Sequence, residues 1–217
     1  MKMNESVFKM FRRKPAEAAA GGDAAAVYLL VGLGNPGREY RETRHNVGFM
    51  VIDQLCKDFN LSLTRVQSKA LVGSVMLDDR RVILAKPQTY MNLSGQAISA
   101  LMHFYKIPVE QLLVAHDDID LPLGTLRLRP GGGSAGQKGI ASTIEQLGNP
   151  NFARMRLGIG RPGGQKAAAD YVLQDFNKAD REILDLVLPR AAEAARVFVR
   201  SGLETAMNQF NGALEKG

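Results

Sequence analysis

The 217-residue sequence contains one cysteine, no tryptophan and only three histidines. A single cysteine excludes an intramolecular disulfide, and Cys56 falls on the apolar side of a predicted helix, so we expect a buried thiol rather than a nucleophile. No stretch reaches the ~18 apolar residues that a membrane-spanning helix requires, and we find no secretory apolar region. We therefore expect a cytoplasmic protein with no membrane partner.

Charge is unevenly distributed along the chain, whose formal net charge is +6. Residues 1–26 carry five basic and three acidic side chains, which leaves a net charge of +4 for the rest. Alanine and glycine dominate the second half of this segment, so we expect a disordered N-terminal extension over residues 1–26. Residues 27–217 suit one domain, and their charge moderately favours a polyanionic partner.

The most informative stretch is VYLLVGLGNPGREYRETRHNVGF, which spans residues 27–49. An apolar, β-branched run at residues 27–31 stops at Gly32, as expected of a buried strand that ends in a loop. Further glycines and Pro36 constrain the loop, so Asn35 should be held close to the end of the strand. His45 follows ten residues later, where an apolar helical pattern begins.

Strand and helix patterns alternate through the rest of the chain, which predicts a single-domain α/β fold. We expect a twisted, mixed and mainly parallel β-sheet with helices on both faces. Two C-terminal helices are expected, the first of them kinked or broken at Pro189. The expected strands cover residues 27–31, 71–77, 81–85, 112–115, 125–129 and 155–159. The expected helices begin near residues 45, 94 and 139, and the second C-terminal helix lies near 203–210.

Three predicted strand ends deliver polar loops, at residues 35–45, 90–92 and 116–118. Ligands usually bind at this edge of an α/β sheet. His45 is a candidate general base, and Asp117 could orient the Nδ1 proton of a histidine. Asn35 and Asn92 offer neutral amides that suit a peptide backbone or a developing oxyanion. Taken singly, each of these residues could instead be a helix cap or a strand-end hydrogen-bonding group.

Several other site types fit less well. GLGNPG satisfies a dinucleotide-binding glycine pattern, but a charged loop follows it instead of a helix, and no acid ends a second strand. GGGSAGQKG is not a phosphate-binding Walker loop, because glycine follows Lys138 where a hydroxyl is needed. A metal site at His116, Asp117, Asp118 and Asp120 lacks a supporting histidine or cysteine pair. There is no Gly-x-Ser-x-Gly elbow, so water is the expected nucleophile.

Basic residues gather in the second half of the chain, on or beside the glycine-rich loop. Arginine forks and exposed backbone N–H groups suit a nucleic-acid backbone, although an ordinary solvated face is the alternative. Few aromatic residues are interleaved with them, which favours phosphate contacts to a folded RNA over base stacking. The basic set comprises Arg127, Arg129, Lys138, Arg154, Arg156 and Arg161.

Four blocks together resemble the bacterial peptidyl-tRNA hydrolase family, and they occur in the order found in that family. They are GLGNPG-x-x-Y-x-x-T-R-H-N-x-G (32–48), PQTYMNLSG (87–95), HDDIDLP-x-G (116–124) and GGGSAGQKG (131–139). The resemblance covers the chain from Val27 to about Asn211. It implies a monomeric, metal-free esterase without a cofactor that removes peptides from tRNA after abortive translation.

The resemblance also implies roles for individual residues. His45 corresponds to the general base, Asp117 to its supporting carboxylate, Asn35 to a position that recognises N-blocked substrates, and Asn92 to one that holds the substrate backbone. Further substrate or tRNA contacts are implied for Tyr40, Tyr90, Met91, Arg129, Lys138 and Arg156. The sequence departs from the best-known members at Gln137 and Lys138, where they carry His-Asn. A lysine there would instead bind the tRNA terminus through its charge.

The resulting functional hypothesis is hydrolysis of the ester bond between peptide and tRNA, with His45 activating water. The alternative is a non-catalytic RNA-binding relative of the same fold, which the substitution at Lys138 favours. The presence of all the other site residues favours the enzyme.

Overall fold

The computed structural model describes residues 26–163 and 167–214. The expected N-terminal extension lies outside this described part except for its last residue. Seven strands form one sheet in the order β2-β3-β4-β1-β5-β7-β6. Their bounds are β1 Val27–Gly32, β2 Arg65–Gln67, β3 Ala70–Leu77, β4 Arg80–Pro87, β5 Leu112–Asp118, β6 Leu126–Arg129 and β7 Ala153–Gly158.

The four central strands are parallel, because β1 pairs in parallel with β4 and β5, and β5 pairs in parallel with β7. Strands β2, β3 and β6 add antiparallel pairs at the two edges. The prediction of a mixed α/β sheet with a parallel centre is therefore confirmed. Strands β1 and β5 read as unbroken apolar runs over most of their length, as buried parallel strands do.

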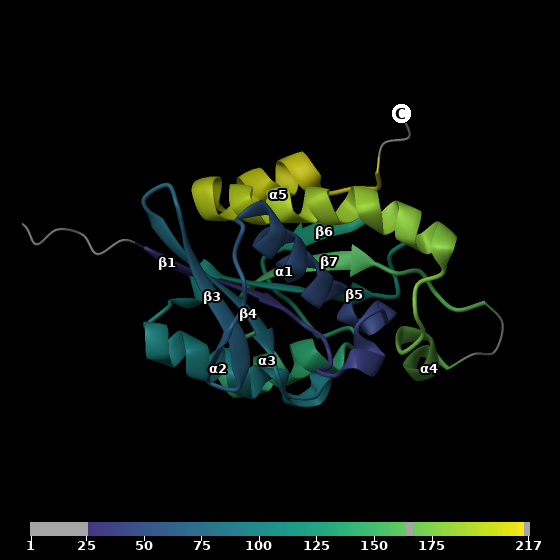
Figure 1. The fold of residues 1–217 in the computed structure, drawn as a ribbon, viewed down its shortest axis with the longest axis horizontal. Helices are drawn as coiled ribbons and strands as arrows, with labels where there is room; N and C mark the ends of the chain where they lie inside the picture. The colour runs from purple at the N-terminus through teal and green to yellow at the C-terminus, as the bar shows by residue number, and fades with distance from the viewer. Residues whose placement is uncertain (1–25, 164–166, 215–217) are drawn as a thin grey trace, which may run out of the picture.

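Helices cover both faces of the sheet, as Figure 1 shows. Helices α1 and α5 lie on one face and α2 and α3 on the other, each over its own cluster of buried apolar side chains. The helices are α1 Val47–Asp58, α2 Ser94–Tyr105, α3 Lys138–Leu147, α4 Ala168–Val172 and α5 Lys178–Phe210. Short 3₁₀ turns are η1 Arg38–Tyr40, η2 Arg44–Asn46, η3 Met91–Leu93 and η4 Val109–Gln111.

The C-terminal helical region differs from the prediction. Helix α5 continues through Pro189 and is interrupted at Gly202, whose φ of 84° and ψ of 173° are non-helical. The prediction of a break at Pro189 is therefore wrong, whereas the second helical piece does lie near residues 203–210. Pro189 is exposed, so the carbonyl that loses its helical partner faces solvent. Glycine is suited to the interruption because it adopts positive φ without a steric penalty.

Strand β5 is longer than expected and carries His116, Asp117 and Asp118 within the sheet. All seven of its residues are buried, so these polar groups are fixed by strand geometry and not by a loop. The parallel centre then brings the carboxyl ends of β1, β4 and β5 to one edge of the sheet. Strand β1 lies between β4 and β5 in the sheet. The carboxyl ends of such central strands are where an α/β sheet usually binds its ligand.

Candidate active site

An imidazole and a carboxylate form the centre of the site. Nδ1 of His45, in η2, lies 2.9 Å from Oδ2 of Asp117, at the end of β5. The two side chains are 12% and 3% exposed, so the pair is largely shielded from water. Since Asp117 occupies the Nδ1 side of the ring, Nε2 is the nitrogen available to a substrate or a water molecule.

Asn35 is fixed at three points in the loop after β1. Its backbone N–H donates to Oδ1 of Asn46 over 2.8 Å, and its carbonyl accepts from Nδ2 of Asn46 over 2.9 Å. Its own Oδ1 accepts from the backbone N–H of Met91 over 2.8 Å, which leaves the Nδ2 donor for a ligand. Asn35 was a predicted site residue, whereas Asn46, whose side chain locks this loop to η2, was not.

One cleft of about 770 Å³ collects the predicted catalytic residues. Asn35, His45, Asn92 and Asp117 all line it, so segments far apart in the chain converge as the sequence predicted. Apolar side chains form a further part of the lining, the apolar wall: Ile119, directly after β5, Ala168, Ala169 and Val172 of α4, and Leu173, directly after α4. The cleft thus combines a polar floor with an apolar wall, a common arrangement in ligand sites.

The other predicted contact residues divide into two groups. Tyr90, Met91 and Lys138 line the cleft, with Met91 buried and Tyr90 61% exposed. Tyr40 lies in η1, outside the residues that line the cleft. Lys138 is the first residue of α3 and is exposed, so its ammonium group can reach an incoming anion.

Gln137 is a site residue whose contacts the sequence did not reveal. Its Nε2 lies 3.0 Å from Oδ1 of Asp117, the carboxylate oxygen that does not face His45. Its Oε1 accepts from the backbone N–H of Ile140 over 2.7 Å and so caps α3. The only signal in the sequence was the position of Gln137 directly before the helix, which is where a capping residue lies.

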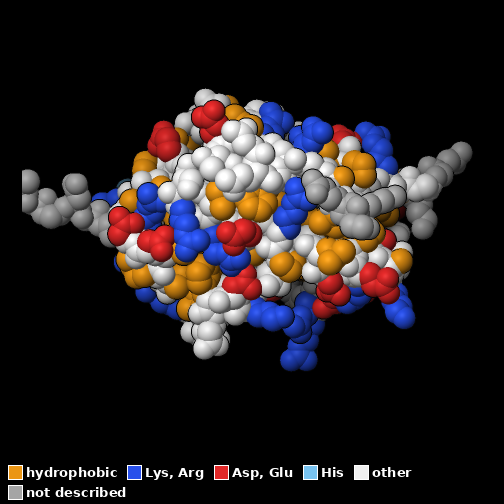
Figure 2. All heavy atoms as spheres, turned by 90° about the horizontal axis from the view of Figure 1, so that it is seen from above, with side chains coloured by type: hydrophobic (Ala, Val, Ile, Leu, Met, Phe, Trp, Pro, Cys, Tyr) orange, Lys and Arg blue, Asp and Glu red, His pale blue; other side chains and the backbone are white. Residues whose placement is uncertain are grey.

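The predicted basic residues differ in their exposure and in their hydrogen-bonding partners. Arg156 donates to Asp118 over 2.5 Å, and exposed Arg161 pairs with Asp120 over 2.6 Å. Arg129 is half-buried beside the glycine-rich loop. On the face seen from above, acidic and basic side chains are interspersed, as Figure 2 shows.

Arg154 is the clearest correction within this basic set. It is 2% exposed and donates to the carbonyls of Gly132, Gly133 and Pro150, beneath the glycine-rich loop. Burial, reinforced by the nearby charges of Arg129 and Arg156, lowers the pKa of its guanidinium to about 10. Arg154 therefore supports the loop from inside and is not part of an exposed basic surface.

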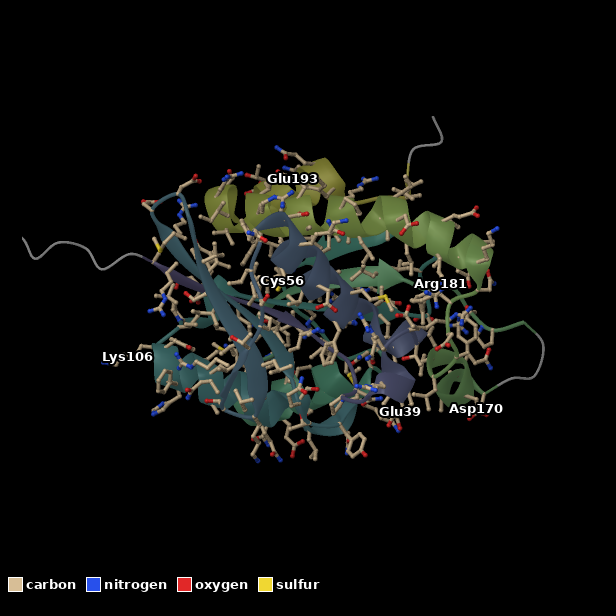
Figure 3. The ribbon with its side chains drawn as sticks, viewed as in Figure 1. Glu39, Cys56, Lys106, Asp170, Arg181 and Glu193 are labelled. Atoms are coloured by element: carbon tan, nitrogen blue, oxygen red, sulfur yellow. The ribbon has the colours of Figure 1, made fainter. Side chains whose placement is uncertain are left out.

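Cys56 and His116 are buried. Cys56 lies in α1, in the interior of the molecule (Figure 3), and burial raises the pKa of its thiol to about 11. Such a thiol is protonated at neutral pH and is a poor nucleophile, in agreement with the prediction of a buried cysteine. Burial also lowers the pKa of His116, whose Nδ1 donates to the carbonyl of Asp117 over 2.8 Å.

Within residues 26–163 and 167–214, no three His, Cys, Asp or Glu side chains are grouped closely enough to hold a metal ion. The carboxylates of Asp118 and Asp120 instead accept hydrogen bonds from arginines. Within the same ranges, no helix combines the length and apolar character needed to cross a bilayer.

The fold and the cleft together define an α/β protein whose site holds an imidazole–carboxylate pair among carboxamides. Residues 29–217 match the family model described as peptidyl-tRNA hydrolase. The chain therefore belongs to the peptidyl-tRNA hydrolase family, and its activity is the hydrolysis of peptidyl-tRNA. This agrees with the functional hypothesis drawn from the sequence and does not favour the non-catalytic alternative.

Named relatives and solved structures support this placement. The chain is 49% identical over 183 residues to the peptidyl-tRNA hydrolase of Desulforamulus reducens, covering 84% of this chain and 88% of the relative. It is 45% identical to a mitochondrial peptidyl-tRNA hydrolase of Oryza sativa, covering 88% of this chain and 77% of the relative. The crystal structure of the Acinetobacter baumannii enzyme matches with a TM-score of 0.81 at 35% identity, covering 89% of this chain and 98% of that one.

Proposed function

We propose that His45 is the general base of the hydrolysis. Its Nε2 would take a proton from a water molecule as that water attacks the ester carbonyl joining peptide and ribose. The tetrahedral intermediate would then break its bond to the ribose oxygen, which would take the proton back from the imidazolium. Asp117 would hold the ring through Nδ1, keep the proton there and stabilise the imidazolium that forms. The observation that carries this proposal is the 2.9 Å contact between Nδ1 of His45 and Oδ2 of Asp117 at the floor of the cleft.

The carboxamides of Asn35 and Asn92 would position the acyl group. With its Oδ1 engaged by Met91, Asn35 presents a fixed N–H donor, which suits a carbonyl oxygen of the peptide or the developing oxyanion. Asn92 is exposed on η3 at the cleft and offers both a donor and an acceptor to the substrate backbone. A donor that is already fixed loses little entropy when charge develops on the substrate.

The tRNA part of the substrate would lie across the positively charged side of the cleft. Lys138 at the cleft, Arg129 beside the glycine-rich loop and Arg156, which engages Asp118, would supply charges for phosphate. Tyr90, which is largely exposed at the cleft rim, is the proposed stacking or packing contact. Tyr40 lies outside the cleft, and any contact it makes would involve a more distant part of the substrate.

We further propose that the catalytic unit is residues 27–217, that it works as a monomer in the cytoplasm, and that it needs no metal. One chain supplies every residue assigned to the reaction, and the family acts on a product of translation. A chain starting at Ala26 should therefore keep full activity. It should also sediment as one copy, and its kcat should not change on treatment with a chelator.

Replacing His45 tests the central assignment. His45→Ala should lower kcat on an N-acetylaminoacyl-tRNA by about 10²- to 10⁴-fold, the usual contribution of a general base. Binding of the uncleaved substrate should change little, because the imidazole carries none of the phosphate contacts. His103→Ala is the matched control, since His103 is exposed on α2 and should be silent. Turnover of His45→Ala within threefold of the parent would refute the proposal.

A further inference from the structure

Gln137 has a hydrogen-bonding partner for each polar group of its amide. Nε2 donates to Oδ1 of Asp117 over 3.0 Å and also lies 3.2 Å from Sδ of Met91. Oε1 accepts from the backbone N–H of Ile140 over 2.7 Å, at the first turn of α3. The side chain is therefore held between a helix end and the carboxylate that faces His45.

The chemistry of the partners fixes which end of the amide points which way. The backbone N–H of Ile140 can only donate, so it must meet the oxygen of Gln137. An ionised Asp117 can only accept, so it must meet the nitrogen. The two contacts support the same orientation and leave no equivalent flipped arrangement.

We propose that Gln137 is a positioning residue for the reaction, acting through Asp117. By holding Oδ1, it stops the carboxylate from rotating and keeps Oδ2 directed at Nδ1 of His45. The capping bond from Ile140 anchors the Nε2 donor of Gln137 to α3. The orientation of the His45 ring is therefore linked to α3, which lies on the face of the sheet opposite to α1. The inference rests on the proposed roles of His45 and Asp117.

Other charges near the pair are already accounted for. Asp118, next to Asp117, is engaged by Arg156 over 2.5 Å. Burial lowers the pKa of His116 from its usual value, which keeps that ring neutral. Lys138 lies at the cleft on the first turn of α3. A change at Gln137 therefore alters one hydrogen bond to Asp117 and leaves these groups in place.

Gln137→Glu separates the two functions of the side chain. One carboxylate oxygen can still accept from the N–H of Ile140, so the cap survives, while the donor to Asp117 is replaced by an acceptor. We expect kcat to fall by about 10- to 100-fold, the range for losing a hydrogen bond to a charged group. The added negative charge favours the protonated ring of His45, so the acid limb of the kcat/KM profile should move to higher pH by about one unit. The thermal midpoint should stay within a few degrees of the parent.

Gln54→Glu is the matched control. Nε2 of Gln54 also donates to an aspartate, Oδ1 of Asp58, over 2.7 Å, but on the surface of α1. The same chemical change there should leave kcat and the pH profile unaltered. A second variant, Gln137→Met, removes both the donor to Asp117 and the cap of α3 without adding charge. It should lower kcat, and the acid limb of its kcat/KM profile should move less than that of Gln137→Glu.

A coupling measurement shows whether Gln137 acts through Asp117. In an Asp117→Ala background, adding Gln137→Glu should change kcat by less than twofold, because its partner is gone. Equal effects in both backgrounds, or an unmoved pH profile in Gln137→Glu, would overturn the inference. If Gln137→Glu does not fold, Gln137→Met and its coupling to Asp117→Ala decide the question. Failure of the His45→Ala test would instead remove the proposed function itself.

Discussion

The guanidinium of Arg44 lies 2.7 Å from the carboxylate of Asp180, and both side chains are largely buried. Nη1 of Arg44 also donates to the carbonyls of Gln174 and Asp175, over 3.1 and 2.5 Å, and its guanidinium packs 4.6 Å from the ring centre of Tyr171. Arg44 precedes His45 in the chain. It therefore ties the turn that carries the proposed base to the segment that forms the apolar wall of the cleft.

Arg44→Lys should weaken both stability and substrate binding. A lysine keeps the charge but cannot reproduce the fork that joins a carboxylate and two carbonyls. We expect the free energy of unfolding to fall by about 2–4 kcal/mol, as for a disrupted buried ion pair. We also expect KM to rise several-fold, because Val172 and Leu173 of the cleft wall lose their anchor. Denaturant unfolding and steady-state kinetics measure the two effects.

Arg200→Lys provides the comparison for Arg44. Arg200 pairs with Asp78 over 2.9 Å, but both partners are about half exposed, at 43% and 59%. Exposed pairs contribute about 0–1 kcal/mol, so this variant should have nearly parental stability and KM. Equal losses of stability in Arg44→Lys and Arg200→Lys would show that Arg44 contributes no more than an exposed ion pair.

Arg154 and Arg129 should respond differently to substitution although they are cross-strand neighbours. Arg154→Lys should lower the free energy of unfolding by about 2–4 kcal/mol, because three backbone carbonyls lose hydrogen bonds to a buried charged group. Arg129→Gln should leave stability almost unchanged. It should reduce the slope of log Kd for tRNA against log salt by about one, as expected for one lost phosphate contact.

Fluorescence binding titrations at several salt concentrations, together with urea unfolding, distinguish the two arginines. A salt slope that falls in Arg154→Lys, with stability retained, would mean that Arg154 reaches the tRNA. It would restore the prediction from sequence that Arg154 belongs to the basic binding surface.

The sequence predicted the parallel core because local patterns are sufficient there. Strands β1, β4 and β5 carry apolar runs that end at glycine, proline or acidic residues, and helices follow with a clear apolar face. Elements β2 and α4 were missed because three and five residues are too few to show periodicity. The break assigned to Pro189 was wrong because solvent exposure, a tertiary property, makes the proline tolerable within the helix.

The site was predictable to the extent that it follows from strand order. Asn35, Asn92 and Asp117 come after or at the end of neighbouring strands, so their convergence follows from the parallel sheet. The contact of Gln137 with Asp117 was not predictable, because it depends on how far α3 projects toward β5. The sequence also could not distinguish buried Arg154 from half-buried Arg156, which lie two residues apart on one face of β7. Their burial differs because the glycine-rich loop covers Arg154 and not Arg156.

His116 should make the stability of the protein depend on pH. Burial lowers its pKa in the folded state, so the folded ring stays neutral below about pH 6.5, where the unfolded ring takes up a proton. The unfolded state then binds more protons, and stability falls as pH drops below about 6.5. An asparagine can place its Nδ2 near the position of Nδ1 and keep the bond to the carbonyl of Asp117. His116→Asn should therefore flatten the pH dependence by up to about 1.4 kcal/mol per pH unit.

The measurement is the free energy of unfolding in urea at several pH values between 5 and 7, for the parent, His116→Asn and His103→Asn. His103 is exposed on α2, so its variant serves as the control and should follow the parent. Other groups, including the carboxylates, contribute equally to all three proteins and cancel in the differences. Parallel curves for the parent and His116→Asn would show that the buried ring takes up its proton in the folded state as readily as in the unfolded one.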